Sequence, residues 1–158
     1  MQKLIKKLNL ELIHYGSNSF EKDWFAPVKN SGFLNKPEGG LWASPVNSEY
    51  GWIDWCKSEN FMLQKLEKSF KFNCNGSFIV INKPEDLEEL PLCFEEHFIE
   101  IGLKFSYFDF EKIAKEVDGV YLTEAGQYRT RLSFPLNLYG WDCESVLIFN
   151  PDVIKYGG

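Results

Sequence analysis

The sequence lacks the long apolar run that a membrane protein or a secreted precursor needs. Nowhere do 18 apolar residues follow one another, and the opening stretch MQKLIKKLNLEL builds no long apolar segment. A membrane-spanning helix needs about 20 apolar residues, and a signal peptide needs a continuous apolar core. We therefore expect a cytoplasmic protein with no membrane partner.

Metal-binding spacings are missing as well, and basic residues are few. The cysteines Cys56, Cys74, Cys93 and Cys143 are scattered, with no C-x-x-C pair and no histidine at a ligand spacing. We therefore expect no metal site. Lysine and arginine number 17 against 23 acidic residues, a net charge of -6. Because binding to a phosphate backbone depends on clustered basic residues, we do not expect nucleic acid as a partner.

The common catalytic signatures are also absent. The sequence contains no G-x-S-x-G, no G-x-x-x-x-G-K-[ST], no H-E-x-x-H and no G-x-G-x-x-G. These patterns mark esterase-type hydrolases, P-loop enzymes, zinc proteases and Rossmann dinucleotide sites. Each of these classes loses its most direct sequence support.

What the chain does contain is the material for one packed core. It has 158 residues, of which 44% are hydrophobic and 16% aromatic. It shows no internal repeat and no low-complexity linker, so residues 1–158 are predicted to form a single domain. A polar segment rich in Asn, Ser, Lys, Pro and Gly runs from Gly16 to Gly40. Loops of this length in compact domains are often functional.

The apolar pattern predicts more strands than helices. Strands are expected at residues 10–15, in GGLWASP, in SFKFNC, in GSFIVIN, at 119–123 and at 144–151, with YRTRLSF as a further candidate. Helices are expected at 49–61, in KPEDLEEL and in DFEKIAKEV, which follows Asp109 as a candidate N-cap. Because the strands are not regularly interleaved with helices, the fold class is predicted to be α+β.

Three separated fragments carry the remaining chemistry: HYGS, GGLWASP and GWDCESVLIFNPDVI. In this order they resemble the motifs of the ADP-ribosyltransferase superfamily. In that family a first-strand His or Arg, a second-strand aromatic residue with a Ser or Thr, and a last-strand Glu converge on NAD. The resemblance covers about residues 10–154, to the branch of diphtheria toxin and the poly-ADP-ribose polymerases. It implies a split β-sandwich with peripheral helices.

The first two fragments supply the residues that the resemblance assigns to NAD binding. The family's first motif reads His-Gly-Ser/Thr, which here corresponds to His14, Gly16 and Ser17, with one tyrosine inserted after the histidine. In the second fragment Trp42 stands where a tyrosine is usual, and Ser44 is the hydroxyl residue.

The third fragment supplies the catalytic candidates. Glu144 starts an apolar strand, as the family's catalytic glutamate does, and Asp142 holds the position of a second acidic residue in the arginine-modifying branch. Alternate side chains of a strand share a face, so both carboxylates could point into one cleft. Trp52, on the helix predicted at 49–61 after the second fragment, could supply a second aromatic wall beside Trp42.

The resemblance gives these residues a chemistry. Cleavage of the nicotinamide–ribose bond develops positive charge on the ribose, which the Glu144 carboxylate would stabilise. The backbone of Gly16 would approach the carboxamide, and Trp42 or Trp52 would offer an aromatic face to the nicotinamide ring. His14 would hold a ribose hydroxyl. We expect His14, Trp42 and Glu144 to line one cleft.

The resemblance therefore implies an NAD-dependent mono-ADP-ribosyltransferase that uses NAD as its substrate and needs no metal. The acidic net charge favours a basic protein acceptor over nucleic acid, and an arginine side chain suits the pair of carboxylates. Two alternatives stay open. One is an NAD glycohydrolase on the same fold, with water as the acceptor. The other is a catalytically silent module that binds a nucleotide or a protein.

Each candidate also has an ordinary structural interpretation. A histidine at a strand end such as His14 can be a hydrogen-bonded structural residue, and a single tryptophan such as Trp42 can belong to the core. Ser44 can be a turn residue, because a proline follows it. Glu144 can lie at a solvated strand edge, in which case Glu124 is the competing carboxylate.

Overall fold

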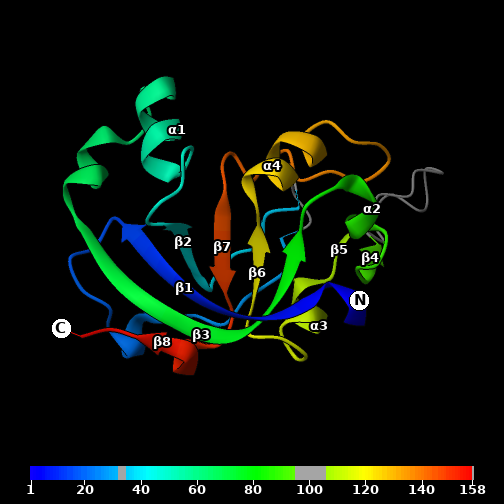
Figure 1. The fold of residues 1–158 in the computed structure, drawn as a ribbon, viewed down its shortest axis with the longest axis horizontal. Coiled ribbons are helices and arrows are strands. Elements are labelled where there is room, and N and C mark those ends of the chain that lie inside the picture. The colour runs from blue at the N-terminus through cyan, green and yellow to red at the C-terminus, as the bar shows by residue number, and fades with distance from the viewer. Residues whose placement is uncertain (32–34, 95–105, 158) are drawn as a thin grey trace.

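The computed structural model describes residues 1–31, 35–94 and 106–157, and these form one compact unit of mixed strands and helices (Figure 1). Within these residues the main sheet has six strands, in the order β1 (Ile5–Tyr15), β2 (Leu41–Pro45), β7 (Ser145–Ile148), β6 (Gly119–Leu122), β3 (Ser69–Ile81) and β8 (Ile154–Lys155). Strand β1 also pairs with β3, so the first five strands of this order close into a ring. A separate pair consists of β4 (Leu92–Phe94) and β5 (Ser106–Phe108).

Strand β3 is one continuous strand where the sequence predicts two. Its first half alternates, with Phe70, Phe72 and Cys74 buried, and its last residues are buried on both faces. The break between the two predicted strands falls at Asn75, yet the strand continues through Asn75 and Gly76, where the missing side chain makes room for Asp118. Two separate predicted strands therefore become the longest strand of the sheet.

Strand β1 begins at Ile5, five residues earlier than predicted. It pairs antiparallel with β3 along its whole length, from Ile5 opposite Ile79 to Tyr15 opposite Ser69. Figure 1 shows these two long strands running side by side beneath the shorter β2, β7 and β6. The early residues of β1 carry exposed lysines, so their strand structure depends on pairing with β3 and not on a local apolar pattern.

The helices are short. The α-helices are α1 (Trp52–Glu59), α2 (Pro84–Leu87), α3 (Phe110–Ile113) and α4 (Glu124–Thr130). The 3-10 helices are η1 (Gln2–Leu4), η2 (Lys22–Trp24), η3 (Leu63–Glu67) and η5 (Pro151–Val153). The predicted N-cap of α3 is confirmed, because the Asp109 side chain accepts a hydrogen bond from the Lys112 amide at 3.1 Å.

The prediction of a strand in YRTRLSF is wrong. Its first residues belong to α4, which begins after the N-cap Thr123, whose hydroxyl accepts a hydrogen bond from the Gly126 amide at 3.0 Å. The Thr130 hydroxyl then donates to the Gly126 carbonyl at 2.7 Å inside the helix. Local side-chain hydrogen bonds of this kind favour a helix start, and they outweigh the strand propensity of the segment.

The core has two parts, one on each face of the sheet. Along β7, Leu147 contributes to one buried cluster, and its neighbours Val146 and Ile148 contribute to the other. At the edge where β6 ends and β7 begins, α1 and α4 lie on either side (Figure 1). The α+β character predicted from the sequence therefore agrees with the structure. No helix in the described part of the chain is long and apolar enough to cross a membrane.

The long polar segment from Gly16 to Gly40 is mostly irregular, and its residues 32–34 lie outside the described part of the chain. It contains η2 and an isolated bridge between Lys29 and Glu38. After this bridge the segment leads into β2, which carries the second predicted motif.

Candidate functional site

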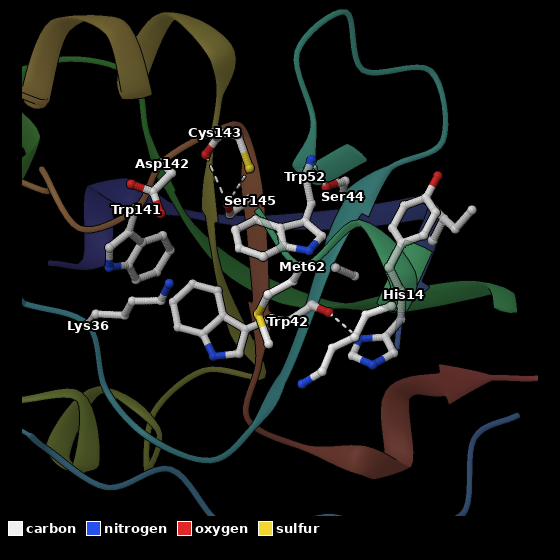
Figure 2. Close-up of a pocket in the computed structure, with 14 residues that line it drawn as sticks. His14, Lys36, Trp42, Ser44, Trp52, Met62, Trp141, Asp142, Cys143 and Ser145 are labelled. Atoms are coloured by element: carbon white, nitrogen blue, oxygen red, sulfur yellow. Dashed lines mark hydrogen bonds between the residues drawn. The ribbon is translucent and has the colours of Figure 1, made fainter. Parts of the chain in front are cut away.

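Residues from distant parts of the sequence line a cavity of about 280 Å³, which we call the tryptophan cavity. Its lining combines strands β1 and β2, helices α1 and η3, the segment before β7 and one residue of the long polar segment (Figure 2). The side chains that define its chemistry are Trp42, Trp52, Trp141, His14, Lys36 and Asp142.

Three indole rings form the walls. Trp42 meets Trp141 edge to face, with ring centroids 4.6 Å apart and an interplanar angle of 70°. The ring of Trp52 stacks on the ring of Trp55, with centroids 5.1 Å apart. Each of the two predicted tryptophans is therefore fixed by another indole, which makes a rigid aromatic wall.

His14 lies at the end of β1 and is oriented by β2. Its Nδ1 lies 2.6 Å from the backbone carbonyl oxygen of Trp42. A carbonyl oxygen only accepts hydrogen bonds, so Nδ1 carries the proton and donates it. Burial lowers the pKa of His14 below its ordinary value of 6.5, against the opposing effect of this hydrogen bond. The ring is therefore neutral at physiological pH, and its Nε2 is a hydrogen-bond acceptor.

Lys36 brings a positive charge to the aromatic walls. Its Nζ lies 5.4 Å from the ring centroid of Trp42 and 5.7 Å from that of Trp52. Asp142 lines the same cavity, where burial raises the pKa of its carboxyl and the charge of Lys36 acts in the opposite direction. Figure 2 shows Lys36 on the side of the cavity that Asp142 and Trp141 also border.

Ser44 has a structural role in addition to its place in the lining. Its hydroxyl oxygen accepts a hydrogen bond from the Trp52 amide at 2.9 Å, at the first turn of α1. Asp54 caps the same helix end by accepting from the Gly51 amide at 2.9 Å. Ser44 therefore positions the helix that carries the second tryptophan wall.

Gly16 and Ser17 are not brought to the cavity. The Gly16 amide donates to the Lys68 carbonyl at 2.8 Å, and the Ser17 hydroxyl donates to the Ser19 carbonyl at 2.8 Å. The expectation that the Gly16 amide faces a ligand is therefore not met. Tyr15, the inserted residue of the first motif, lines the cavity in place of Gly16.

Glu144 lines a second cavity of about 590 Å³, which lies between α1 and α4 and which we call the acidic cavity. Five carboxylates contribute to its lining: Glu49, Glu59, Glu124, Asp142 and Glu144. Glu144 is buried, with 8% of its surface exposed, and accepts a hydrogen bond from the Tyr121 hydroxyl at 2.5 Å. Burial and this carboxylate both raise the pKa of the Tyr121 hydroxyl.

The single cleft expected for His14, Trp42 and Glu144 is therefore two cavities. His14 and Trp42 meet in the tryptophan cavity, Glu144 lines the acidic one, and Asp142 lines both. Cys143 and Ser145 line the tryptophan cavity, whereas Glu144 between them lines the acidic cavity. Glu144 lies just before β7, which begins at Ser145. The competing candidate Glu124 lines only the acidic cavity.

Several lining residues have no counterpart among the sequence candidates. Lys36 comes from the polar segment, where no local pattern marks it. Trp141 lies inside the third fragment, directly before Asp142, and this position was the available signal.

Cys143 also lines the tryptophan cavity, but burial raises its pKa to about 12, so its thiol stays protonated and is a poor nucleophile. Within the described residues, no group of three or more His, Cys, Asp and Glu side chains could hold a metal ion.

Comparison with known proteins gives no family and no relative. No family model matches the chain, and searches of curated proteins and of solved structures find no match. The functional argument therefore depends on the site itself.

Proposed function

We propose that the protein is an NAD-dependent mono-ADP-ribosyltransferase that modifies a protein acceptor. The observation that carries the proposal is the convergence on one cavity of His14, Trp42 and Ser44, from the first two motifs, with Asp142 from the third. The same order of motifs underlies the resemblance to the ADP-ribosyltransferases. A split β-sandwich with peripheral helices is the finer architecture that this proposal implies.

The tryptophan cavity suits the nicotinamide–ribose half of NAD. Its volume of about 280 Å³ lies just below the range of ligand pockets, about 300–1,000 Å³, and so fits part of a dinucleotide. The indoles of Trp42 and Trp52 offer faces for a flat ring. The neutral His14 offers Nε2 as an acceptor for a ribose hydroxyl.

Asp142 and Glu144 are the proposed catalytic carboxylates. The ribose would lie where the two cavities adjoin at Asp142, with Glu144 on the acidic side, held by Tyr121. The bond between ribose C1′ and the nicotinamide nitrogen breaks, and its electron pair neutralises the ring. An acceptor nitrogen then bonds to C1′ and releases a proton to a carboxylate. Carboxylates already in place stabilise the positive charge that develops between these steps.

A nicotinamide-release assay tests the proposal. Glu144→Gln should lower turnover about 100-fold or more, while NAD still binds, because it removes one preorganised electrostatic partner. Glu124→Gln is the matched control: it removes a carboxylate from the acidic cavity only, and we expect nearly normal turnover. Normal turnover in Glu144→Gln with loss in Glu124→Gln would transfer the catalytic role to Glu124. No release of nicotinamide by the wild-type protein would contradict the proposed function and favour a silent binding module.

A further inference from the structure

We propose that the tryptophan cavity is an aromatic cage for an organic cation, and that Lys36 is a resident cation that such a ligand displaces. The cavity is the one used in the proposed function, and the inference rests on that function only in choosing a pyridinium ring as the ligand. Beyond that function, the inference states that the cavity selects a positively charged ligand.

The geometry around Lys36 is that of a cation site. One ammonium lies within 6 Å of two indole centroids, at 5.4 Å from Trp42 and 5.7 Å from Trp52. Attraction between a cation and an aromatic face is significant within about 6 Å, and tryptophan is the strongest partner. Trp141 stands edge-on to Trp42 and closes a third side. Aromatic cages of this general kind recognise methylated ammonium groups.

The charge of the cavity agrees with this interpretation. Once Lys36 is displaced, the charged groups of the lining are Asp142 and Lys65. The adjoining acidic cavity has five carboxylates, Asp142 among them, against the single cation Arg131. A positive ligand is therefore attracted both by the ring faces and by the negative charge behind them.

Lys36 is held weakly enough to leave. Within the described residues its ammonium forms no hydrogen bond and no ion pair, so the indole faces and the charge of Asp142 are what hold it. Its long side chain comes from an irregular segment, and its charged end can return to water at small cost. A ligand that brings its own positive charge replaces the ammonium without leaving the cage uncharged.

The nicotinamide ring of oxidised NAD carries a positive charge, and the reduced ring is neutral. The cage therefore favours the oxidised form by the charge of its ring. It should also favour the cation 1-methylnicotinamide over neutral nicotinamide, which has nearly the same shape. This pair of small probes isolates ring charge from every contact made by the rest of a dinucleotide.

Calorimetric titration with these two probes tests the inference. We expect 1-methylnicotinamide to bind about tenfold more tightly than nicotinamide, the middle of the range for a partly desolvated cation–π contact. Lys36→Met keeps the apolar stem and removes the competing charge, so the cation should bind several-fold more tightly still. Lys65→Met is the matched control, because Lys65 lines the cavity but its ammonium lies over no ring among the described residues.

Equal binding of the two probes, no binding of the cation, or weaker cation binding in Lys36→Met would each overturn the cage. These outcomes are distinguishable from failure of the proposed function. Turnover of NAD without a preference for the cationic probe rejects the cage and leaves the transferase in place. A preference for the cationic probe without turnover of NAD supports the cage and rejects the transferase.

Discussion

His14 shows how one backbone contact determines the chemistry of a side chain. The carbonyl of Trp42 fixes the proton on Nδ1, and burial keeps the ring neutral. This interaction explains why a histidine stands at the end of β1 even before a ligand is considered. This structural role is compatible with the proposed role in ligand binding, because the hydrogen bond to β2 uses one nitrogen and leaves the other for a ligand.

The lowered pKa of His14 predicts a pH-dependent contribution to stability. The unfolded state takes up the proton near the ordinary pKa of 6.5, and the folded state takes it up only at lower pH. The stabilising contribution is therefore present above pH 6.5 and is lost as the pH falls below this value. In His14→Asn the side-chain amide can still donate to the Trp42 carbonyl but does not titrate.

Urea denaturation at pH 7.5 and at pH 5.5 would measure this effect. We expect the free energy of unfolding to decrease more in the wild-type protein than in His14→Asn between these two pH values. Equal decreases in both proteins would show that the histidine does not titrate differently in the folded and unfolded states.

At the scale of elements, β3 shows where a glycine is required by packing and not by a turn. A Cβ built on Gly76 would lie 2.6 Å from Oδ2 of Asp118. That carboxylate accepts hydrogen bonds from the Ser77 amide at 2.8 Å and from the Asn150 side chain at 2.9 Å. The carboxylate cannot move away without breaking these contacts, which join β3 to the segments flanking β6 and β7.

Gly76→Ala should therefore destabilise the protein by about 1–3 kcal/mol, the usual cost of forcing extra volume into a packed site. Gly157→Ala is the matched control, because a Cβ there meets nothing within 4 Å. Thermal or chemical unfolding of both variants would measure the difference. An unfolding free energy in Gly76→Ala equal to that of the control would mean that Asp118 adapts without loss.

The elements also show what the sequence could and could not predict. Strands β2, β6 and β7 are short apolar runs, and their positions follow from local pattern. The full lengths of β1 and β3 depend on their mutual pairing, from Ile5 opposite Ile79 onward, which no local pattern contains. Helix α4 was missed because its start depends on a single side-chain hydrogen bond at Thr123.

The same distinction applies to the site. His14, Trp42, Ser44 and Asp142 were predicted from ordered motifs and Trp52 from the helix that follows the second motif, and the fold brings them to one cavity. The place of Lys36 depends on how an irregular segment returns toward the indoles, which is set by tertiary structure. Glu144 was predicted to start the strand, but it lies just before β7, where no strand alternation determines which cavity its side chain lines.

At the scale of the whole molecule, acidic side chains are in excess, and five of them meet at one cavity. The chain carries a net charge of -6, and among the described residues Glu89 and Asp152 are the only acidic side chains that form ion pairs. Five carboxylates and Arg131 line the acidic cavity. This surface attracts basic partners over distances of about the Debye length, roughly 8–10 Å at physiological salt.

The location of this charge predicts the acceptor. Nucleic acid is repelled by the acidic cavity that adjoins Asp142, whereas a guanidinium group is attracted to it and can be oriented by two carboxylates beside the reacting carbon. Incubation with labelled NAD and a cell lysate, followed by mapping of the modified residues by mass spectrometry, should place ADP-ribose on arginine side chains of proteins. The labelling should weaken as the salt concentration rises, because exposed charges steer the encounter.

Glu49→Gln lowers the charge of the cavity at a position outside the proposed catalytic pair, so it should reduce labelling of proteins more than release of nicotinamide. Label on nucleic acid would contradict this assignment, and free ADP-ribose as the sole product would make water the acceptor and the protein an NAD glycohydrolase.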